Sequence, residues 1–175
     1  EIDALGQATE IRRDDRGNLV EQRSPDGGTI KVAYDDHDRP ISLLGPAGGE
    51  WKWVYDGDGR LVERSDALGQ STRFRWAGPR LLGVTDPSAA ETLLAYDGAG
   101  NVTVLRLPNG AESRWSYDGL GRCLRSQDAG GNVENRQFDL LGRPLCIQQP
   151  DGEQRELPYD GEGNVVRAME KQTQG

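Results

Sequence analysis

The hexapeptide Tyr55-Asp56-Gly57-Asp58-Gly59-Arg60 decides the fold, because its aromatic, acidic and glycine positions recur along the whole chain. The aromatic position is occupied at Tyr34, Tyr55, Trp76, Tyr96, Tyr117, Phe138 and Tyr159, with spacings of 21, 21, 20, 21, 21 and 21 residues. Arg13 extends the series to an eighth copy. Agreement over so many copies at a fixed period indicates a repeat architecture.

The residues that follow each aromatic position recur as well. Aspartate usually comes next, a glycine usually follows three residues later, and the residue after that is always Arg or Asn. The candidate repeat signature therefore contains the aromatic positions together with Asp35, Asp56, Gly59, Arg60, Asp97, Gly100, Asp118, Gly121, Arg122, Asp139, Gly142, Arg143, Asp160 and Gly163. An aspartate can accept N–H bonds at the start of a turn, and a glycine can take the positive φ that closes a hairpin. We expect one turn at this place in every copy.

A second turn signal lies seven residues before each aromatic position. Glycine stands there in seven of the eight copies, the first being Gly6, and Ala89 stands there in the fifth copy. Pro-Asp, Pro-Asn or Asp-Ala-Leu precedes several of these glycines, as at Asp3–Gly6. The segments of about six or seven residues between the turns alternate with the period of two that is typical of half-buried strands. The sequence predicts an all-β fold, a single long antiparallel meander of about 16 strands made of eight 21-residue hairpin repeats.

Apolar residues form columns when the copies are aligned. Two residues before the aromatic position stand Ile11, Val32, Trp53, Phe74, Leu94, Trp115, Arg136 and Leu157. The matching column on the outgoing strand contains Val20, Ile41, Val62, Leu82, Thr103, Leu124, Leu145 and Val166, followed two residues later by Leu43, Val84, Leu105 and Ile147. We expect these columns to form an apolar stripe that serves as the core, with Trp115 inside it.

The number of strands constrains the architecture. At about 4.8 Å per strand, the sheet would extend roughly 75 Å, and open twisted sheets of that size curl or split. No segment remains to supply a second layer, because the repeat uses nearly the whole chain. One apolar face must therefore meet another part of the same spiral, further repeats, an enclosed cargo or a symmetry partner.

Composition limits the classes of partner. Apolar residues make up 34% of the chain and aromatic residues 6%, which is too little for an ordinary two-layer core. The net charge of −8 disfavours nucleic acids and anionic membrane surfaces. No apolar run has the length of a membrane-spanning helix, and the N-terminus lacks a signal segment. We expect no nucleic-acid partner and no membrane insertion by this segment.

The units Tyr55–Leu61 and Tyr117–Arg122, each followed by a second glycine turn, resemble the YD repeats of the Rhs family. The resemblance covers essentially all of residues 1–175, which it implies to be one YD/Rhs repeat array and a fragment of a larger shell. It implies a long β-sheet that spirals into a hollow cocoon, as in bacterial Rhs effectors and Tc toxin complexes, with related barrels in teneurins and wall-associated proteins.

The resemblance also implies a function. The chain would be a structural, non-catalytic segment of a shell that encapsulates a toxin or effector domain for delivery. Its partners would be the rest of its own shell, the enclosed toxin domain and delivery-machinery proteins. The protein would be made in the cytoplasm of a bacterium and then secreted or delivered, as in competition between bacteria.

Three copies depart from the pattern. The first has Arg13 in place of an aromatic residue, the second has Asp38 in place of the turn glycine, and the fourth, Trp76-Ala77-Gly78-Pro79-Arg80, lacks the aspartate and is one residue short. We expect that fourth turn to be tightened. The self-cleaving core domain of the family, with paired Asp-Pro-x-Gly-Leu motifs, is not matched, since Asp86-Pro87 reads only as a turn. No catalytic residue is therefore transferred, and no enzyme activity is expected.

Other candidate sites have simpler interpretations. Asp56-Gly57-Asp58-Gly59 resembles the start of a calcium loop, but Ala67 stands where an EF-hand needs glutamate. His37, the only histidine, lies in a predicted turn without a second His or Cys nearby. Cys123 and Cys146 fall on strands that an intervening strand would hold about 10 Å apart, too far for a disulfide. We expect no cofactor, no metal site and two free thiols.

Trp51, Trp53 and Tyr55 alternate along one predicted strand and therefore share one face. Packing between strands explains them, and a platform for stacking sugars is the alternative. The alternative function is an extracellular carbohydrate- or protein-binding adhesion module at the cell surface. The container is favoured because the apolar columns persist in nearly every repeat, as packing requires, whereas a binding site should be localised.

Overall fold

The computed structural model describes residues 8–166 and 169–172, and in this part of the chain every regular element is a β-strand. The strands are β1 (Glu10–Arg13), β2 (Leu19–Arg23), β3 (Thr29–Tyr34), β4 (Pro40–Leu44), β5 (Glu50–Tyr55), β6 (Leu61–Ser65), β7 (Ser71–Ala77), β8 (Arg80–Thr85), β9 (Glu91–Tyr96), β10 (Val102–Arg106), β11 (Glu112–Tyr117), β12 (Cys123–Gln127), β13 (Val133–Phe138), β14 (Pro144–Gln148), β15 (Glu153–Glu156) and β16 (Met169–Gln172). The turn expected at Asp3–Gly6 lies outside the described residues. The described residues include no helix of the length and apolarity needed to cross a membrane.

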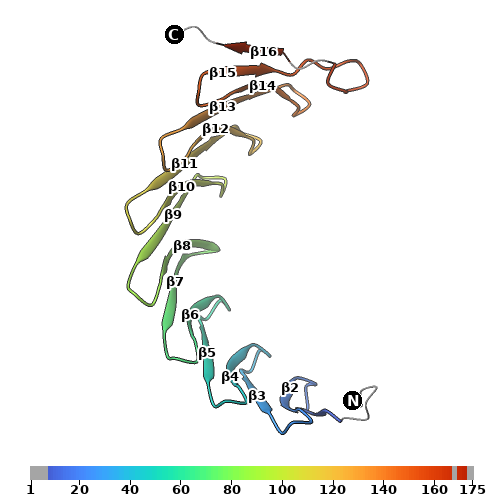
Figure 1. The fold of residues 1–175 in the computed structure, drawn as a ribbon, viewed down its shortest axis with the longest axis vertical. Helices are drawn as coiled ribbons and strands as arrows, with labels where there is room; N and C mark the ends of the chain where they lie inside the picture. Colours follow the sequence, from blue (N-terminus) through green and yellow to red (C-terminus); the bar gives the residue numbers. More distant parts are fainter. Residues whose placement is uncertain (1–7, 167–168, 173–175) are drawn as a thin grey trace. The chain divides into compact units, whose positions relative to one another are not determined.

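The strands form a 16-stranded sheet whose order follows the order of the chain from β1 to β16. The predicted all-β antiparallel meander is therefore confirmed. The chain divides into two compact units, residues 1–90 and residues 91–175. Within each unit, consecutive strands pair as antiparallel hairpins, and Figure 1 shows them as a row of strands joined by short turns.

The turns at both edges of the hairpins have the same backbone geometry. In the turn after β5, the Asp56 N–H donates to the Arg60 carbonyl at 3.0 Å, and the Gly59 N–H donates to the Asp56 carbonyl at 3.0 Å. The turn after β6 repeats both bonds between Asp66 and Gln70 and between Gly69 and Asp66. Such a turn needs a left-handed residue at its fourth position, and Gly59 has a φ of +84°. The recurring glycines are explained by this requirement.

Two turns place a residue other than glycine in the left-handed region. Asp38 has a φ of +60° and Ala89 a φ of +67°. Each occupies the position that glycine holds in the other copies. A residue with a Cβ is strained in this conformation, more so for alanine than for aspartate, whose short polar side chain can bond locally.

The turn of the fourth copy is tighter than the others, as the missing residue predicts. Ala77 pairs with Arg80, so only Gly78 and Pro79 lie between β7 and β8. Gly78 takes a positive φ of +54°. Positive φ at the first central residue is the requirement of a type II′ hairpin turn.

The register places both apolar columns on one face of the sheet, called here the apolar face. Val32 lies opposite Leu43, Phe74 opposite Val84, and Leu94 opposite Leu105. The residue opposite Val32 is thus Leu43, which lies two positions beyond Ile41, the residue of the outgoing strand that the aligned columns matched with Val32. A β-bulge in each aromatic-turn hairpin from β1–β2 to β13–β14 contributes to this shift, because it sets two outgoing residues against one.

The expectation of a buried core is wrong. No hydrophobic side chain in the described residues is fully buried, and Trp53 and Trp115 are half-buried. Within each unit, an apolar side chain is covered by its neighbours along and across the strands and has no second layer above it. The columns therefore form a half-buried stripe on a single-layered sheet.

The other face of the sheet carries charged cross-strand pairs. Arg12 contacts Glu21 at 3.0 Å, Arg73 contacts Glu63 at 3.2 Å, and Arg106 contacts Glu112 at 2.8 Å. In each pair, the two residues lie directly opposite one another in the register. Opposite charges that lie directly across from one another favour the observed strand register over shifted registers.

Candidate functional site

The signature residues gather at the turns that follow the aromatic positions. In the turn after β3, Asp35 Oδ1 accepts the backbone N–H groups of His37 and Arg39 at 2.9 and 3.0 Å. Asp35 Oδ2 accepts the Arg39 Nε–H at 2.7 Å. The bond from the Arg39 side chain is the largest cause of the lowered pKa of Asp35, from 3.8 to about 2, and the backbone donors act in the same direction. The aspartate is therefore held as a carboxylate.

The same arrangement recurs in both units. Arg60 contacts Asp56 at 2.7 Å, Arg122 contacts Asp118 at 2.5 Å, and Arg143 contacts Asp139 at 2.6 Å. Where the copy has Asn101, its amide donates to Asp97 Oδ2 at 2.9 Å, and this bond is the largest cause of a lowered pKa at Asp97. In the copies that have a turn aspartate, Arg and Asn are interchangeable at this position because both side chains can donate to the turn carboxylate.

Five of the aromatic residues reach back to the preceding repeat. A polar atom on each of these rings donates a hydrogen bond to a carbonyl 15 residues earlier in the chain. The bonds run from Tyr34 to Leu19 at 3.1 Å, Tyr55 to Pro40 at 3.1 Å, Trp76 to Leu61 at 2.9 Å, Tyr117 to Val102 at 2.9 Å and Tyr159 to Pro144 at 2.8 Å. Tryptophan can replace tyrosine at this position because its indole N–H supplies the same donor.

Three turn arginines reach forward to the aromatic ring of the following repeat. The guanidinium carbon of Arg39 lies 4.6 Å from the ring centre of Tyr55, and that of Arg143 lies 4.4 Å from the ring centre of Tyr159. Arg122 takes the same place at 5.0 Å over Phe138. These distances fall within the range of cation–π attraction.

The arginines also contact the backbone of the next turn. The Arg122 guanidinium donates to the Asp139 carbonyl at 2.8 Å, and that of Arg60 donates to the Gly78 carbonyl. A Cβ added at Gly59 would lie 2.9 Å from Arg39 Nη1. Glycine at this position thus serves both the turn and the approach of the arginine. We call the aromatic residues, the turn aspartates and the Arg or Asn residues together the inter-repeat ladder.

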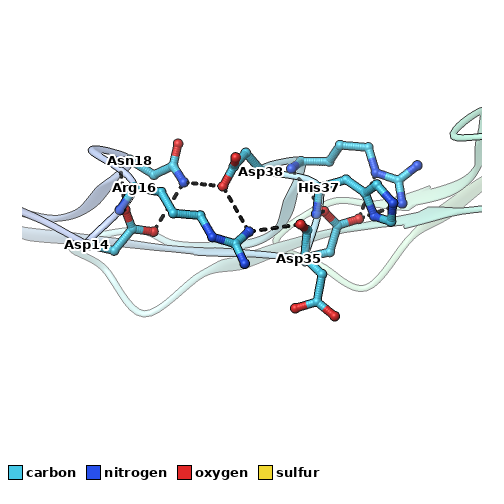
Figure 2. A network of polar contacts seen from close by, with 8 residues as sticks. Asp14, Arg16, Asn18, Asp35, His37 and Asp38 are labelled. Atoms are coloured by element: carbon cyan, nitrogen blue, oxygen red, sulfur yellow. Dashed lines mark hydrogen bonds and ion pairs between the residues drawn. The ribbon is translucent and has the colours of Figure 1, made fainter.

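The first two described turns of the ladder depart from the pattern and compensate for one another. Figure 2 shows that Asp38, which replaces the turn glycine, faces Asn18 and Arg16 of the preceding turn. Its carboxylate accepts the Asn18 amide at 2.7 Å and the Arg16 guanidinium at 3.3 Å. The Asp38 side chain therefore joins two repeats where no arginine occupies the Asn18 position.

The remaining candidate residues lie apart from one another. His37 is exposed in its turn and donates its backbone N–H to Asp35. Cys123 and Cys146 are free thiols. No group of His, Cys, Asp or Glu side chains in the described residues is arranged to hold a metal ion. The charged ladder residues form ion pairs with each other and hydrogen bonds with the backbone of the next turn. The arrangement therefore links neighbouring repeats.

Sequence reasoning missed two features of the ladder. The carbonyls that accept from the aromatic residues, such as that of Pro40, carry no signal in their own side chains. The forward contact of Arg39 with Tyr55 depends on how neighbouring hairpins sit side by side. The constancy of Arg or Asn at one position was visible in the sequence and could have indicated a role beyond the turn.

Comparisons with known proteins agree with this geometry. The model of the RHS repeat matches residues 13–50, 55–91, 77–112 and 96–133. No curated protein matches the chain. Among solved structures, the chain is similar to TcdB2-TccC3, with 19% identity and a TM-score of 0.56 over 92% of this chain and 12% of that one.

Two further solved structures are similar to the same extent. TcdB2-TccC3-TEV has 18% identity and a TM-score of 0.55 over 92% of this chain and 12% of that one. TcdB2-TccC3 without its hypervariable C-terminal region has 17% identity and a TM-score of 0.52 over 93% of this chain and 11% of that one. At this identity the likeness shows the fold alone, and the chain spans only a small part of these proteins. The tandem hairpins of the chain share one ladder of contacts, and the RHS repeat model covers more than half of the chain. The chain therefore belongs to the RHS repeat family.

Proposed function

We propose that residues 1–175 are one repeat array, a non-catalytic segment of the wall of a hollow RHS-repeat shell that encloses a toxin or effector domain for delivery. The single observation that carries the proposal is the single-layered sheet. Its repeats are tied edge to edge by the inter-repeat ladder, and no hydrophobic side chain of the described residues is fully buried. A sheet of this kind is suited to form a wall.

A wall must resist separation of its strands. Between neighbouring repeats the sheet supplies backbone pairing, the aromatic residue supplies one more hydrogen bond, and the turn arginine supplies a ring contact and a backbone contact. Each contact is modest, but they recur at successive junctions, and the stability of a repeat array grows as the sum of such nearest-neighbour terms. The charged side chains of the signature form ion pairs and hydrogen bonds with each other and with the backbone, which supports a structural role.

A single-layered sheet with an apolar face also needs a cover. Half-buried side chains such as Val32, Trp53, Leu94 and Trp115 would gain further burial, at roughly 25 cal/mol per Å² removed from water, when another surface lies against them. In a closed shell, further repeats or the enclosed polypeptide supply that surface. The partners proposed are accordingly the rest of the same shell, the enclosed domain and the proteins that deliver it.

Localisation follows from the same proposal. The shell would be made in the cytoplasm of a bacterium and then secreted or delivered with its contents. The similar solved structures support this only as relatives in fold, one of them being TcdB2-TccC3 without its hypervariable C-terminal region.

Protease protection tests the proposal. The natural protein that contains this array is treated with a broad-specificity protease, and the survival of the segment downstream of the array is followed by mass spectrometry. A shell protects that segment in the intact protein, and a variant with Tyr55→Ala and Tyr117→Ala, which weakens the wall at two junctions, loses the protection. Equal rates of digestion in the two proteins contradict the proposal. Lys52→Ala, on the charged face, is the matched control and should leave protection unchanged.

A further inference from the structure

The turn between β10 and β11 contains an asparagine that is followed by glycine. Asn109 precedes Gly110, whereas the other five asparagines precede leucine, valine or arginine: Asn18, Asn101, Asn132, Asn135 and Asn164. The Asn109 side chain is exposed to water. Because glycine has no Cβ, its backbone nitrogen is the least hindered of any residue in an attack on the preceding side-chain amide.

The turn holds the Asn109 side chain beside the backbone that follows it. Asn109 Oδ1 accepts the Ala111 N–H at 3.0 Å, which keeps Cγ on the side of the chain where the Gly110 nitrogen lies. A hydrogen bond to the amide oxygen also draws electrons away from Cγ and makes this carbon a better electrophile. Within the described residues, no hydrogen bond restrains the Asn109 Nδ2 amide group. The potential leaving group is therefore free.

The other asparagines are held in the opposite way, through their amide nitrogens. Each donates to a side-chain oxygen: Asn18 to Asp14 at 3.2 Å, Asn101 to Asp97 at 2.9 Å, Asn132 to Asp128 at 2.8 Å, Asn164 to Asp160 at 3.3 Å and Asn135 to Gln148 at 3.3 Å. Three of them precede valine, whose branched side chain crowds the next backbone nitrogen. Asn109 thus differs from the rest in its electrophile, its leaving group and its nucleophile.

The Gly110 nitrogen is restrained by one hydrogen bond. It donates to the Leu107 carbonyl at 2.9 Å. This bond must open before the nitrogen can lose its proton and turn toward Cγ of Asn109. One ordinary hydrogen bond favours the closed state by a factor of only about five, and exposed turns open locally without global unfolding. The turn therefore slows an attack by this nitrogen without preventing it.

The chain already contains aspartate in two turns of the same kind. Asp26 and Asp151 each follow a proline and precede a glycine, as Asn109 does. Asp26 Oδ1 accepts the Gly28 N–H at 3.0 Å, and Asp151 Oδ1 accepts the Glu153 N–H at 2.9 Å. These bonds are equivalent to the bond that Asn109 accepts. An aspartate at position 109 would therefore preserve the turn.

We propose that Asn109 is a self-modification site, where the chain loses ammonia and forms aspartate and isoaspartate through a cyclic imide. A base in the solvent removes the Gly110 N–H proton, the nitrogen bonds to Cγ, and the Cγ–Nδ2 bond breaks. Nδ2 takes up a proton and leaves as ammonia. Water then opens the ring at Cγ, which yields aspartate, or at the backbone carbonyl carbon of residue 109, which yields isoaspartate.

The two products have different effects on the hairpin of β10 and β11. Aspartate adds one negative charge and keeps the turn bonds. Isoaspartate inserts a methylene group into the main chain before Gly110, so the turn bonds of Gly110 and Ala111 no longer close together. The hairpin is then loosened in a slow and irreversible step. This chemistry belongs to the array itself and does not depend on what the shell encloses.

Peptide mapping of the full chain after incubation at mildly alkaline pH tests the site. Trypsin releases residues 107–114, and this peptide should gain one mass unit and separate into two forms. A carboxyl methyltransferase specific for isoaspartate should label one of the two forms. The proposal predicts that Asn109 reacts faster than any other asparagine of the chain, with Asn132 of the same unit as the internal reference.

Matched variants separate the chemistry from a change of fold. Gly110→Ala should slow the reaction several-fold, and the turn should accept it because Ala89 holds the equivalent position with a φ of +67°. Asn109→Asp should keep the thermal midpoint of the natural chain, and the isoaspartate form should melt lower. Circular dichroism establishes that each variant keeps its strands.

Three results would each overturn the proposal. The first is an unchanged mass of the peptide 107–114 in the incubated chain. The second is a reaction at Asn132 that is as fast as that at Asn109. The third is a folded Gly110→Ala variant that reacts at the rate of the natural chain.

Discussion

Three successive junctions in the second unit use different combinations of the two contacts of the inter-repeat ladder, the hydroxyl bond and the arginine–ring contact. Tyr117 donates its hydroxyl to Val102 at 2.9 Å, but Asn101 stands where an arginine would stack on its ring. Phe138 lies under Arg122 at 5.0 Å, but it has no hydroxyl to donate. Tyr159 has both contacts, with Arg143 at 4.4 Å and the Pro144 carbonyl at 2.8 Å.

The comparison teaches that the two contacts are separable. The pairing of β10 with β11 and that of β12 with β13 have the same pattern although each junction lacks one of the contacts, so neither contact is required to set the register. Each adds a modest stabilisation to a register that the turns and bulges already define. In the first unit, Tyr55 has both contacts, with Arg39 over its ring and Pro40 as its acceptor.

The largest effect is expected from removing both contacts at once. Tyr55→Ala deletes the ring beneath Arg39 and the hydroxyl bond to Pro40, and should lower the free energy of unfolding by about 2 to 3 kcal/mol, less than for a fully buried ring because this ring is half-buried. Urea unfolding measures the change. Tyr55→Phe is the matched control, which loses only the hydroxyl and should cost about 1 kcal/mol. Equal losses in the two variants would show that the ring contributes nothing.

Restoring a missing hydroxyl should stabilise the chain. Phe138→Tyr places an O–H where the other tyrosines donate to the carbonyl 15 residues earlier, which here is that of Cys123. The expected gain is about 1 kcal/mol in urea unfolding. Tyr117→Phe makes the opposite change at the neighbouring junction and should lose a similar amount. A Phe138→Tyr variant of unchanged or lower stability contradicts the assignment of this bond.

Restoring a missing arginine should have a smaller effect. Asn101→Arg would keep the pairing with Asp97 and extend a guanidinium over Tyr117, as Arg122 does for Phe138. The expected gain is about 0.5 to 1 kcal/mol, the range for an exposed cation–π pair. Asn101→Gln, which can pair with Asp97 but carries no charge, is the control and should show no gain.

Mild acid should have the smallest effect. The folded pKa of Asp35 lies below its ordinary value, at about 2, so the unfolded chain binds more protons than the folded chain as the pH falls. The stability from this aspartate is fully present above the ordinary pKa of 3.8 and is lost as the pH falls toward 2. The thermal unfolding midpoint should therefore stay constant from neutral pH to about pH 5. A marked fall in that range would contradict the assigned state of the turn aspartates.

The sequence predicted the meander because its signals are local. Gly59 and Asp56 act within a single turn, so their spacing alone identified the hairpins. The bulge that sets Val32 opposite Leu43 arises from pairing between strands, and the aligned columns did not reveal it. The absence of a buried core also escaped prediction, because alternation indicates a half-covered face and does not show what covers it.

The candidate ladder was predicted only in part, for a related reason. The bonds of Asp118 to the backbone and side chain of Arg122 lie within one turn, and the residue types indicated them. The contacts of Arg122 with Phe138 and of Tyr117 with Val102 join residues about one repeat apart. Such contacts depend on the stacking of hairpins, which the residue types alone do not specify.

The central claim is that turn arginines and aromatic rings of adjacent repeats attract one another across the sheet. A double-mutant cycle with Arg39→Gln and Tyr55→Leu measures this attraction directly, because it subtracts what each residue does alone. The claim predicts a coupling of about 0.5 to 1 kcal/mol in urea unfolding. A coupling of zero, with the two losses strictly additive, would contradict it.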